Sequence, residues 1–283
     1  MEHETAVIDS PPKELRFRRK IRVVKSLREF WRARDLLRAL VERQLRARYK
    51  QALLGAAWAV IPPIALTVVL TLFVQRVVDI RTGGVPYPLF SYVALVPWSF
   101  FSSAVTNATG SLLGNKDLLN KVYCPREVFP FAGIVTATVD MIVGLIPLAI
   151  LFAAYSFAPR WTALWIPVLF AVQVAFTLGV SLLMSALVVY LRDLRHGLPM
   201  IIQFGLFATP IAYGINEIPA SLHTLYAVLN PLAPVIDGYR RSLLFGQAPA
   251  WDLLLPGALS AFLLLTVSLI AFKRLETGFA DVA

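Results

Sequence analysis

Charged side chains and cysteine are scarce in this 283-residue chain, and each shortage excludes a class of protein. Only 16% of the residues are charged, whereas 58% are hydrophobic and the mean hydropathy is +0.68. Soluble domains carry about 25% charged and about 45–50% apolar residues, so this composition excludes an ordinary soluble fold. The single cysteine, Cys124, excludes an intramolecular disulfide and a cysteine-based metal site.

Catalytic and metal-binding patterns are also missing from the sequence. The histidines His3, His196 and His223 are far apart and lack metal-ligand spacing, so we expect no metal site. The segment 110–116 resembles a phosphate-binding loop only faintly, because three residues separate its glycines instead of four and Asn115 follows the second. We therefore expect no nucleotide or other cofactor on this chain.

Long apolar runs are what the chain has in abundance. A transmembrane helix needs about 20 apolar residues, and six windows with little or no charge meet this length. We predict an all-α integral membrane protein with spans near residues 53–75, 89–114, 128–157, 162–190, 197–215 and 253–272. A further stretch, residues 218–245, contains Pro219, Pro231 and Pro234, so we interpret it as a re-entrant segment rather than a continuous span.

The positions of the basic residues predict the orientation of these spans. With six spans and a cytoplasmic N-terminus, 22 of the 27 Lys and Arg fall on the cytoplasmic side, in agreement with the positive-inside rule. Both termini are therefore predicted to be cytoplasmic, including the tail 274–283. Because the first long apolar window begins only at Gln51, we expect no cleavable signal peptide.

Most of the net charge of +10 belongs to the first 50 residues, which hold fifteen Lys or Arg against seven Asp or Glu. We expect this arm to be attracted to anionic lipid headgroups and not to nucleic acid. Residues 1–26 are interpreted as a flexible basic segment. Residues 27–50 are predicted to form an amphipathic interface helix, which lies on the membrane, docks a partner, or does both. Its apolar side comprises Phe30, Trp31, Leu37, Leu40 and Val41.

A short polar island, residues 115–127, separates the second and third predicted spans. It combines charges with an apolar set, and Pro125 is suited to end a helix within it, which is typical of a short rigid element that docks on a partner protein. The alternative is a solvated loop that carries ordinary positive-inside charges. The candidate contact residues are Lys116, Asp117, Leu118, Leu119, Lys121, Val122, Tyr123, Arg126 and Glu127.

Two features inside the spans are candidates for a passage. Asp140 is the one ionisable residue well within an apolar window, so it either faces a watery cavity or is supported by Thr136 or Thr138. Aromatic residues near the outer ends of the spans are either interfacial belt residues or a surface along which sugar rings slide. The candidate channel-lining residues are Phe73, Trp98, Phe100, Phe101 and Asp140.

Several short motifs occur in an order that resembles the membrane subunit of type 2 ABC exporters of polysaccharides, the group of O-antigen and teichoic-acid permeases. The motifs are residues 46–50 with Gly55 and Trp58, residues 96–101, the island, residues 192–193, residues 210–213, residues 230–231 and residues 239–240. One departure is Cys124, where this family more often has an aromatic residue.

The resemblance implies a transmembrane domain over residues 51–273, with six helices, a preceding interface helix and two short re-entrant helices before the last span. It also implies a homodimer with two copies of a separate ATPase, which binds ATP and Mg and docks on the island as a coupling loop. The implied function is export of a lipid-linked polysaccharide, such as an O-antigen, a galactan or a teichoic-acid-like polymer, across the bacterial cytoplasmic membrane, with no enzymatic activity in this chain.

Two alternatives remain open. A type 2 ABC exporter of a small drug or lipid would share the architecture. A membrane-embedded glycosyltransferase or phosphatase is the alternative from the enzyme class, and the missing carboxylate or metal cluster disfavours it.

Overall fold

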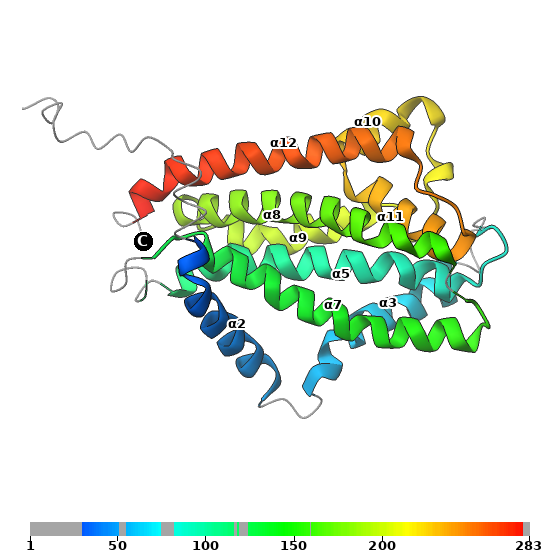
Figure 1. Cartoon of the computed structure of the whole chain (residues 1–283), viewed down its shortest axis with the longest axis horizontal. Coiled ribbons are helices and arrows are strands. Elements are labelled where there is room, and N and C mark those ends of the chain that lie inside the picture. Colours follow the sequence, from blue (N-terminus) through cyan, green and yellow to red (C-terminus); the bar gives the residue numbers. More distant parts are fainter. Residues whose placement is uncertain are drawn as a thin grey trace, which may run out of the picture.

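Four long helices dominate the structure, a computed structural model that describes residues 30–50, 55–74, 82–115, 118, 124–158 and 160–279. These ranges contain helices and connecting loops and no β-strand (Figure 1). The long helices are α5 (Tyr87–Ser111), α7 (Val128–Ala154), α8 (Ile166–Tyr190) and α12 (Trp251–Leu275). Each is long and apolar enough to cross a membrane, α8 together with the preceding turn η5 (Trp161–Trp165). The predicted all-α class and four of the predicted spans are thereby confirmed.

The first and fifth predicted spans correspond to shorter helical segments. The first comprises the 3-10 turn η2 (Gly55–Ala59), α3 (Ile61–Val69) and the π-helical turn η3 (Leu70–Val74). The fifth comprises α9 (Leu194–Ala208), which is only 15 residues long. Both segments fall short of the length that a straight transmembrane helix needs.

The proline-rich stretch is divided into two short helices, as the three prolines predict. They are α10 (His223–Leu229) and α11 (Leu232–Arg240), and Pro231 lies directly before α11, where its missing N–H costs no helical hydrogen bond. A π-helical turn, η8 (Arg241–Phe245), follows and ends at Gly246, whose φ of 66° suits a residue without Cβ. No continuous helix crosses residues 218–245.

Close backbone contacts hold the long helices in two pairs. Gly133 of α7 lies so near α5 that an added Cβ would come within 2.9 Å of the Ala108 nitrogen. Gly179 of α8 similarly faces α12, where an added Cβ would lie 3.1 Å from the Leu265 Cα. Small residues at such crossings let helices approach closely in apolar surroundings.

Different elements occupy the two ends of the bundle (Figure 1). At one end, α2 (Arg34–Tyr49) lies obliquely against α7, near the C-terminal end of α12. At the opposite end lie α10, α11 and the beginning of α5. We call these the α2 end and the α10 end.

Candidate functional site

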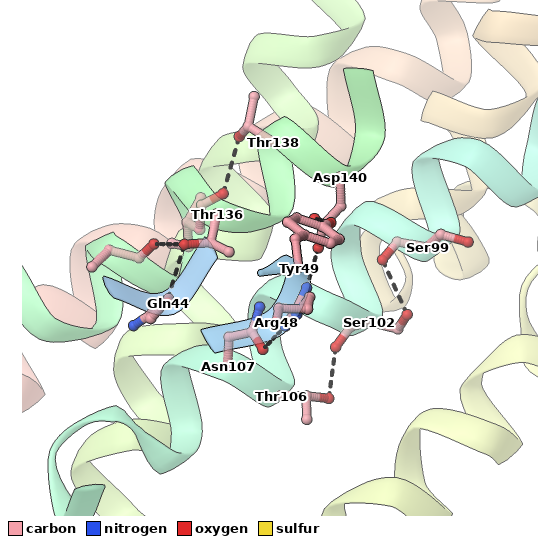
Figure 2. Close-up of polar contacts among 12 residues, drawn as sticks. Gln44, Arg48, Tyr49, Ser99, Ser102, Thr106, Asn107, Thr136, Thr138 and Asp140 are labelled. Atoms are coloured by element: carbon pink, nitrogen blue, oxygen red, sulfur yellow. Dashed lines mark hydrogen bonds and ion pairs between the residues drawn. The ribbon is translucent and has the colours of Figure 1, made fainter. Parts of the chain in front are cut away.

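A row of polar side chains attaches α2 to α5 and α7 (Figure 2). Gln44 accepts a hydrogen bond from the Thr136 hydroxyl at 2.9 Å. One turn later, Arg48 forms an ion pair with Asp140 of α7 and donates to the Asn107 side chain of α5 at 2.9 Å. Because these contacts join three helices, they fix where α2 lies on the bundle. We call Arg48, Tyr49, Asn107 and Asp140 the α2 latch.

The latch explains how a carboxylate is tolerated inside an apolar helix. The Asp140 side chain is 11% exposed, receives a hydrogen bond from the Tyr49 hydroxyl and pairs with the Arg48 guanidinium. A buried charge requires both a counter-charge and hydrogen bonds, and Asp140 has both. Burial, together with the hydrogen bond to Asp140, raises the pKa of Tyr49 to about 12, so its phenol remains a donor at neutral pH.

This geometry corrects the prediction that Thr136 or Thr138 supports Asp140. The Thr136 hydroxyl lies 2.9 Å from both the Gln44 side-chain oxygen and the Ala132 carbonyl oxygen and shares its one proton between them, and Thr138 donates to the Ile134 carbonyl. Neither threonine hydroxyl is therefore directed to Asp140, whose charge is balanced by Arg48 from a separate helix.

A second group of charges joins the start of α7 to the end of α12. The Lys273 ammonium forms ion pairs with Glu127 and, at 3.2 Å, with Glu276. Arg126 donates to the Glu276 carbonyl at 2.5 Å and lies 5.6 Å from the centroid of the Phe279 ring. We call Arg126, Glu127, Lys273, Glu276 and Phe279 the α12 clasp. Burial raises the pKa of the Glu276 carboxyl, and the Lys273 charge opposes that shift.

The α10 end holds a charge in a different way. Arg240, in the last turn of α11, is 2% exposed and its Cζ lies 3.7 Å from the centroid of the Phe90 ring. Its guanidinium donates to the carbonyl oxygens of Pro210 at 2.7 Å, Ile211 at 2.6 Å, Tyr213 at 2.9 Å and Phe90 at 3.2 Å. We call this arrangement the Arg240 cage.

The Arg240 cage compensates for missing secondary structure. The carbonyls of Pro210, Ile211 and Tyr213 belong to the irregular turn after α9, where helical partners are absent. Buried carbonyls need hydrogen-bond donors, and a guanidinium presents five N–H groups in a planar fork. Two motifs that are about 30 residues apart, 210–213 and 239–240, therefore meet in one contact.

Comparison with known proteins places this bundle in a family. Residues 35–244 match the model of the ABC-2 type transporter family. The chain belongs to the ABC-2 type transporter family. It is 31% identical over 257 residues to the O-antigen export system permease protein RfbA of Myxococcus xanthus, covering 90% of this chain and 98% of that protein.

Other relatives of this ABC-2 transporter chain carry related names. An O-antigen export system permease protein RfbA of Klebsiella pneumoniae is 28% identical over 250 residues, with 88% of this chain and 95% of that protein covered. The polysialic acid transport protein KpsM of Escherichia coli is 21% identical over 209 residues, covering 74% of this chain and 81% of that protein. Family membership and the four apolar helices show a multi-pass membrane transport protein.

Three candidate residues of the island are described by the structure of this ABC-2 transporter chain. Leu118 packs with Cys124 against a core cluster that includes Leu40 and Phe279, and Arg126 and Glu127 belong to the α12 clasp. The island is thus attached to the bundle by apolar and charged contacts together. The remaining candidates lie outside the described residues: Lys116, Asp117, Leu119, Lys121, Val122 and Tyr123. Their coupling role stays a prediction.

The candidate channel-lining aromatics lie in different surroundings. Phe100 is 1% exposed and its ring centroid lies 5.6 Å from that of Phe170 in α8. Trp98 is also buried, beside Phe101, which stacks on Phe176 at 5.5 Å. Phe73 is 63% exposed. Within one subunit, Phe100 and Trp98 therefore act as packing residues, and a channel-lining role for the set stays a prediction.

The apolar residues of the predicted interface helix face the bundle, with one exception. Leu40 is buried, and Phe30, Leu37 and Val41 pack against the same cluster at the α2 end. Trp31 is 70% exposed. The side of α2 that buries apolar groups is therefore turned to α7, and Trp31 projects away from it.

Sequence reasoning missed the partners of two charges. It treated Asp140 in isolation, although an intramembrane carboxylate next to an Arg-rich helix is a signal for a pair such as Asp140–Arg48. It named Arg240 only as part of the motif 239–240 and gave it no partner, although an apolar stretch that ends at Ile236 lies shortly before it. Both partnerships depend on tertiary contacts that no local pattern contains.

Proposed function

We propose that this chain is the membrane-spanning subunit of an ATP-driven exporter that moves a lipid-linked polysaccharide across the bacterial cytoplasmic membrane. The observation that carries the proposal is similarity over nearly the full length of proteins named O-antigen export permeases, covering 98% and 95% of two of them. Because the similarity covers nearly all of each relative, it extends over the whole transmembrane unit and not only over a shared fragment.

The architecture of the proposed exporter has six spans, with both termini in the cytoplasm. Residues 55–74 and α9 supply the two spans beyond the four long helices, and α10 and α11 form a re-entrant pair on the outer side. Large apolar side chains on both segments support a membrane or subunit environment, because Leu72, Phe73, Phe204 and Phe207 are 46–63% exposed. Two copies of the chain enclose the passage at their twofold interface.

In the proposed exporter, the ATPase acts on this chain through the island. ATP and Mg bind to two copies of a separate ATPase, so nucleotide acts on this chain only through contacts that differ between the states of the ATPase. The island docks on the ATPase, while Leu118 and the α12 clasp attach it to the bundle. A displacement of the island therefore reaches α7 and α12 together.

Co-purification tests the coupling assignment. Tyr123→Asp, Lys121→Glu and the wild type are produced with their ATPase, and the amount of ATPase retained by the permease is measured. We expect at least tenfold less ATPase with Tyr123→Asp, because a charge replaces an apolar docking group, and full retention with the control Arg241→Gln at the α10 end. Undiminished ATPase binding by both island variants would show that the island is not the docking element.

Complementation tests the transport assignment. A strain that lacks the gene should accumulate lipid-linked glycan inside the cell and lose surface polysaccharide, and the wild-type gene should restore it. Normal surface polysaccharide in the deletion strain would overturn the proposed function.

A further inference from the structure

Gln173 is a polar residue inside the apolar helix α8, and it is 0% exposed. Its amide nitrogen donates to the Pro97 carbonyl of α5 at 2.8 Å. Its amide oxygen accepts a hydrogen bond from the Tyr239 hydroxyl of α11 at 2.9 Å. One side chain therefore joins three helices that pack on one another (Figure 1).

The chemistry of the two partners fixes the direction of both hydrogen bonds. A main-chain carbonyl only accepts, so the NH2 end of the Gln173 amide is directed to Pro97 and the oxygen end to Tyr239. The Tyr239 phenol is then the donor. A displacement of α11 along α8 would leave buried polar groups without a partner, which costs about 1–3 kcal/mol for each group. The two hydrogen bonds thus select one position of α11.

Both ends of this hydrogen-bonded chain lie at special points of the fold. Pro97 is inside α5, where its missing N–H interrupts the helical hydrogen-bond ladder. Tyr239 directly precedes Arg240, whose guanidinium holds the turn after α9. Gln173 is therefore linked to the end of α9 as well, through Tyr239 and the Arg240 cage.

Packing alone does not require an amide at this place. Tyr239 lies in an apolar cluster with Val96 and Leu169, and an apolar side chain at position 173 would avoid the cost of burying an amide. A buried polar group can instead specify one arrangement among several that apolar contacts would allow. Thr177, one turn further along α8, provides the contrast. It is equally buried, but its hydroxyl has no hydrogen-bond partner among the described residues.

We propose that Gln173 is a positioning residue for transport, which holds α11 in one place against α5 and α8 throughout the ATP cycle. Its effect on export rests on the proposed function, whereas the position of α11 does not. The two properties are therefore tested by separate measurements.

A distance measurement by electron paramagnetic resonance tests whether Gln173 fixes α11. Nitroxide labels are attached, in a Cys124→Ser background, at Thr106→Cys on the exposed side of α5 and at Gln247→Cys shortly after η8, which continues α11. The complex with the ATPase is measured without nucleotide and with ATP and vanadate. An excess of unlabelled chain ensures that each complex holds no more than one labelled copy.

The test variant combines Gln173→Met with Tyr239→Phe, so that neither polar group is left unpaired. In the wild type and in the control Thr177→Val, we expect one narrow distance distribution with the same mean in both nucleotide states. In the double variant we expect a similar melting temperature but a distribution about twice as wide, because apolar contacts lose a unique arrangement before they lose stability. If the double variant does not fold, Tyr239→Phe alone, which keeps the bond to Pro97, is measured in its place.

The amount of glycan exported per ATP hydrolysed measures the consequence for transport. We expect this ratio to fall about fivefold in the double variant, as for the loss of one neutral hydrogen bond, while the rate of ATP hydrolysis stays within about twofold of wild type. The control Thr177→Val should keep the wild-type ratio. A residue that only stabilised the fold would lower the amount of complex and leave the ratio unchanged.

Two results would overturn the inference. One is a distribution in the double variant as narrow as in wild type and with the same mean. The other is an unchanged ratio of glycan to ATP in a double variant that exports glycan. A broadened distribution in a complex whose wild type exports no polysaccharide would instead contradict the proposed function alone, because the distance measurement involves no glycan.

Discussion

The two ends of the bundle hold an arginine in opposite ways. At the α10 end, Arg240 is enclosed by carbonyls of the main chain and by the Phe90 ring. At the α2 end, Arg48 is 36% exposed and pairs with a carboxylate and a side-chain amide. Backbone carbonyls do not titrate or rotate away, whereas side-chain ion pairs near water are screened by salt and exchange partners. The comparison indicates that the α10 end is fixed and that the α2 end is adjustable.

Removing Arg240 is expected to have the largest effect. Arg240→Leu leaves the carbonyls of Pro210, Ile211 and Tyr213 without their donor, and breaking a buried charged network costs about 3–5 kcal/mol. We expect a strong loss of folded protein from membranes and a lower melting temperature in detergent. Arg241→Leu, next in sequence, is the control and should remain near wild type. If Arg240→Leu is as abundant and as stable as wild type, the Arg240 cage does not fix the α10 end.

Removing Lys273 from the α12 clasp is expected to have the next largest effect. Lys273→Met leaves Glu127 and Glu276 close together without the ammonium, at side-chain exposures of 12% and 19%. We expect a loss of about 2–3 kcal/mol in the free energy of unfolding. Thermal unfolding measures it, with Arg274→Met as the neighbouring control. Equal melting temperatures for wild type and Lys273→Met would contradict a structural role for the clasp.

The α2 latch is expected to contribute less, because Arg48 remains partly in water. A double-mutant cycle with Arg48→Gln and Asp140→Asn should give a coupling free energy of about 1–2 kcal/mol. Disruption of the latch should also expose the arginines of α2 to trypsin, so the rate of cleavage is a second measure. Arg38→Gln, on the same helix, provides the control. A coupling energy of zero would mean that α2 is held by its apolar side alone.

The smallest expected effect concerns pH. The pKa of Glu276 is raised mainly by burial, so its charged form is disfavoured in the folded state. The folded state favours the protonated Glu276 carboxyl. The stability gained from this preference is therefore fully present below the unfolded pKa of about 4.5 and is lost as pH rises through the raised folded pKa. Glu276→Gln should be slightly more stable than wild type at pH 7, by less than about 1 kcal/mol, and the difference should vanish near pH 4. Melting curves between pH 4 and pH 8 test this, and a difference that widens on acidification would contradict it.

Continuous patterns were predictable from the sequence, whereas contacts across the fold were not. The windows with little or no charge located α5, α7, α8 and α12, because a bilayer imposes both length and composition on a span. The prolines at 219, 231 and 234 predicted the broken stretch before α12. The Arg48–Asp140 pair joins residues 92 positions apart, and the Arg240 cage joins three separate segments. Such partners are chosen by packing, which local periodicity does not encode. The island's candidate docking residues other than Leu118, Arg126 and Glu127 lie outside the described ranges.

The glycine contacts at Gly133 and Gly179 determine where this molecule can bend. With no side-chain layer between the backbones, α5 cannot shear along α7, nor α8 along α12, without a steric clash. We therefore expect α5 to move together with α7, and α8 together with α12. Flexure is left to places where the helical ladder is irregular and no polar cage holds it, such as the π turn at residues 70–74. We therefore expect a hinge of the subunit at residues 70–74, with the two helices of each pair moving together.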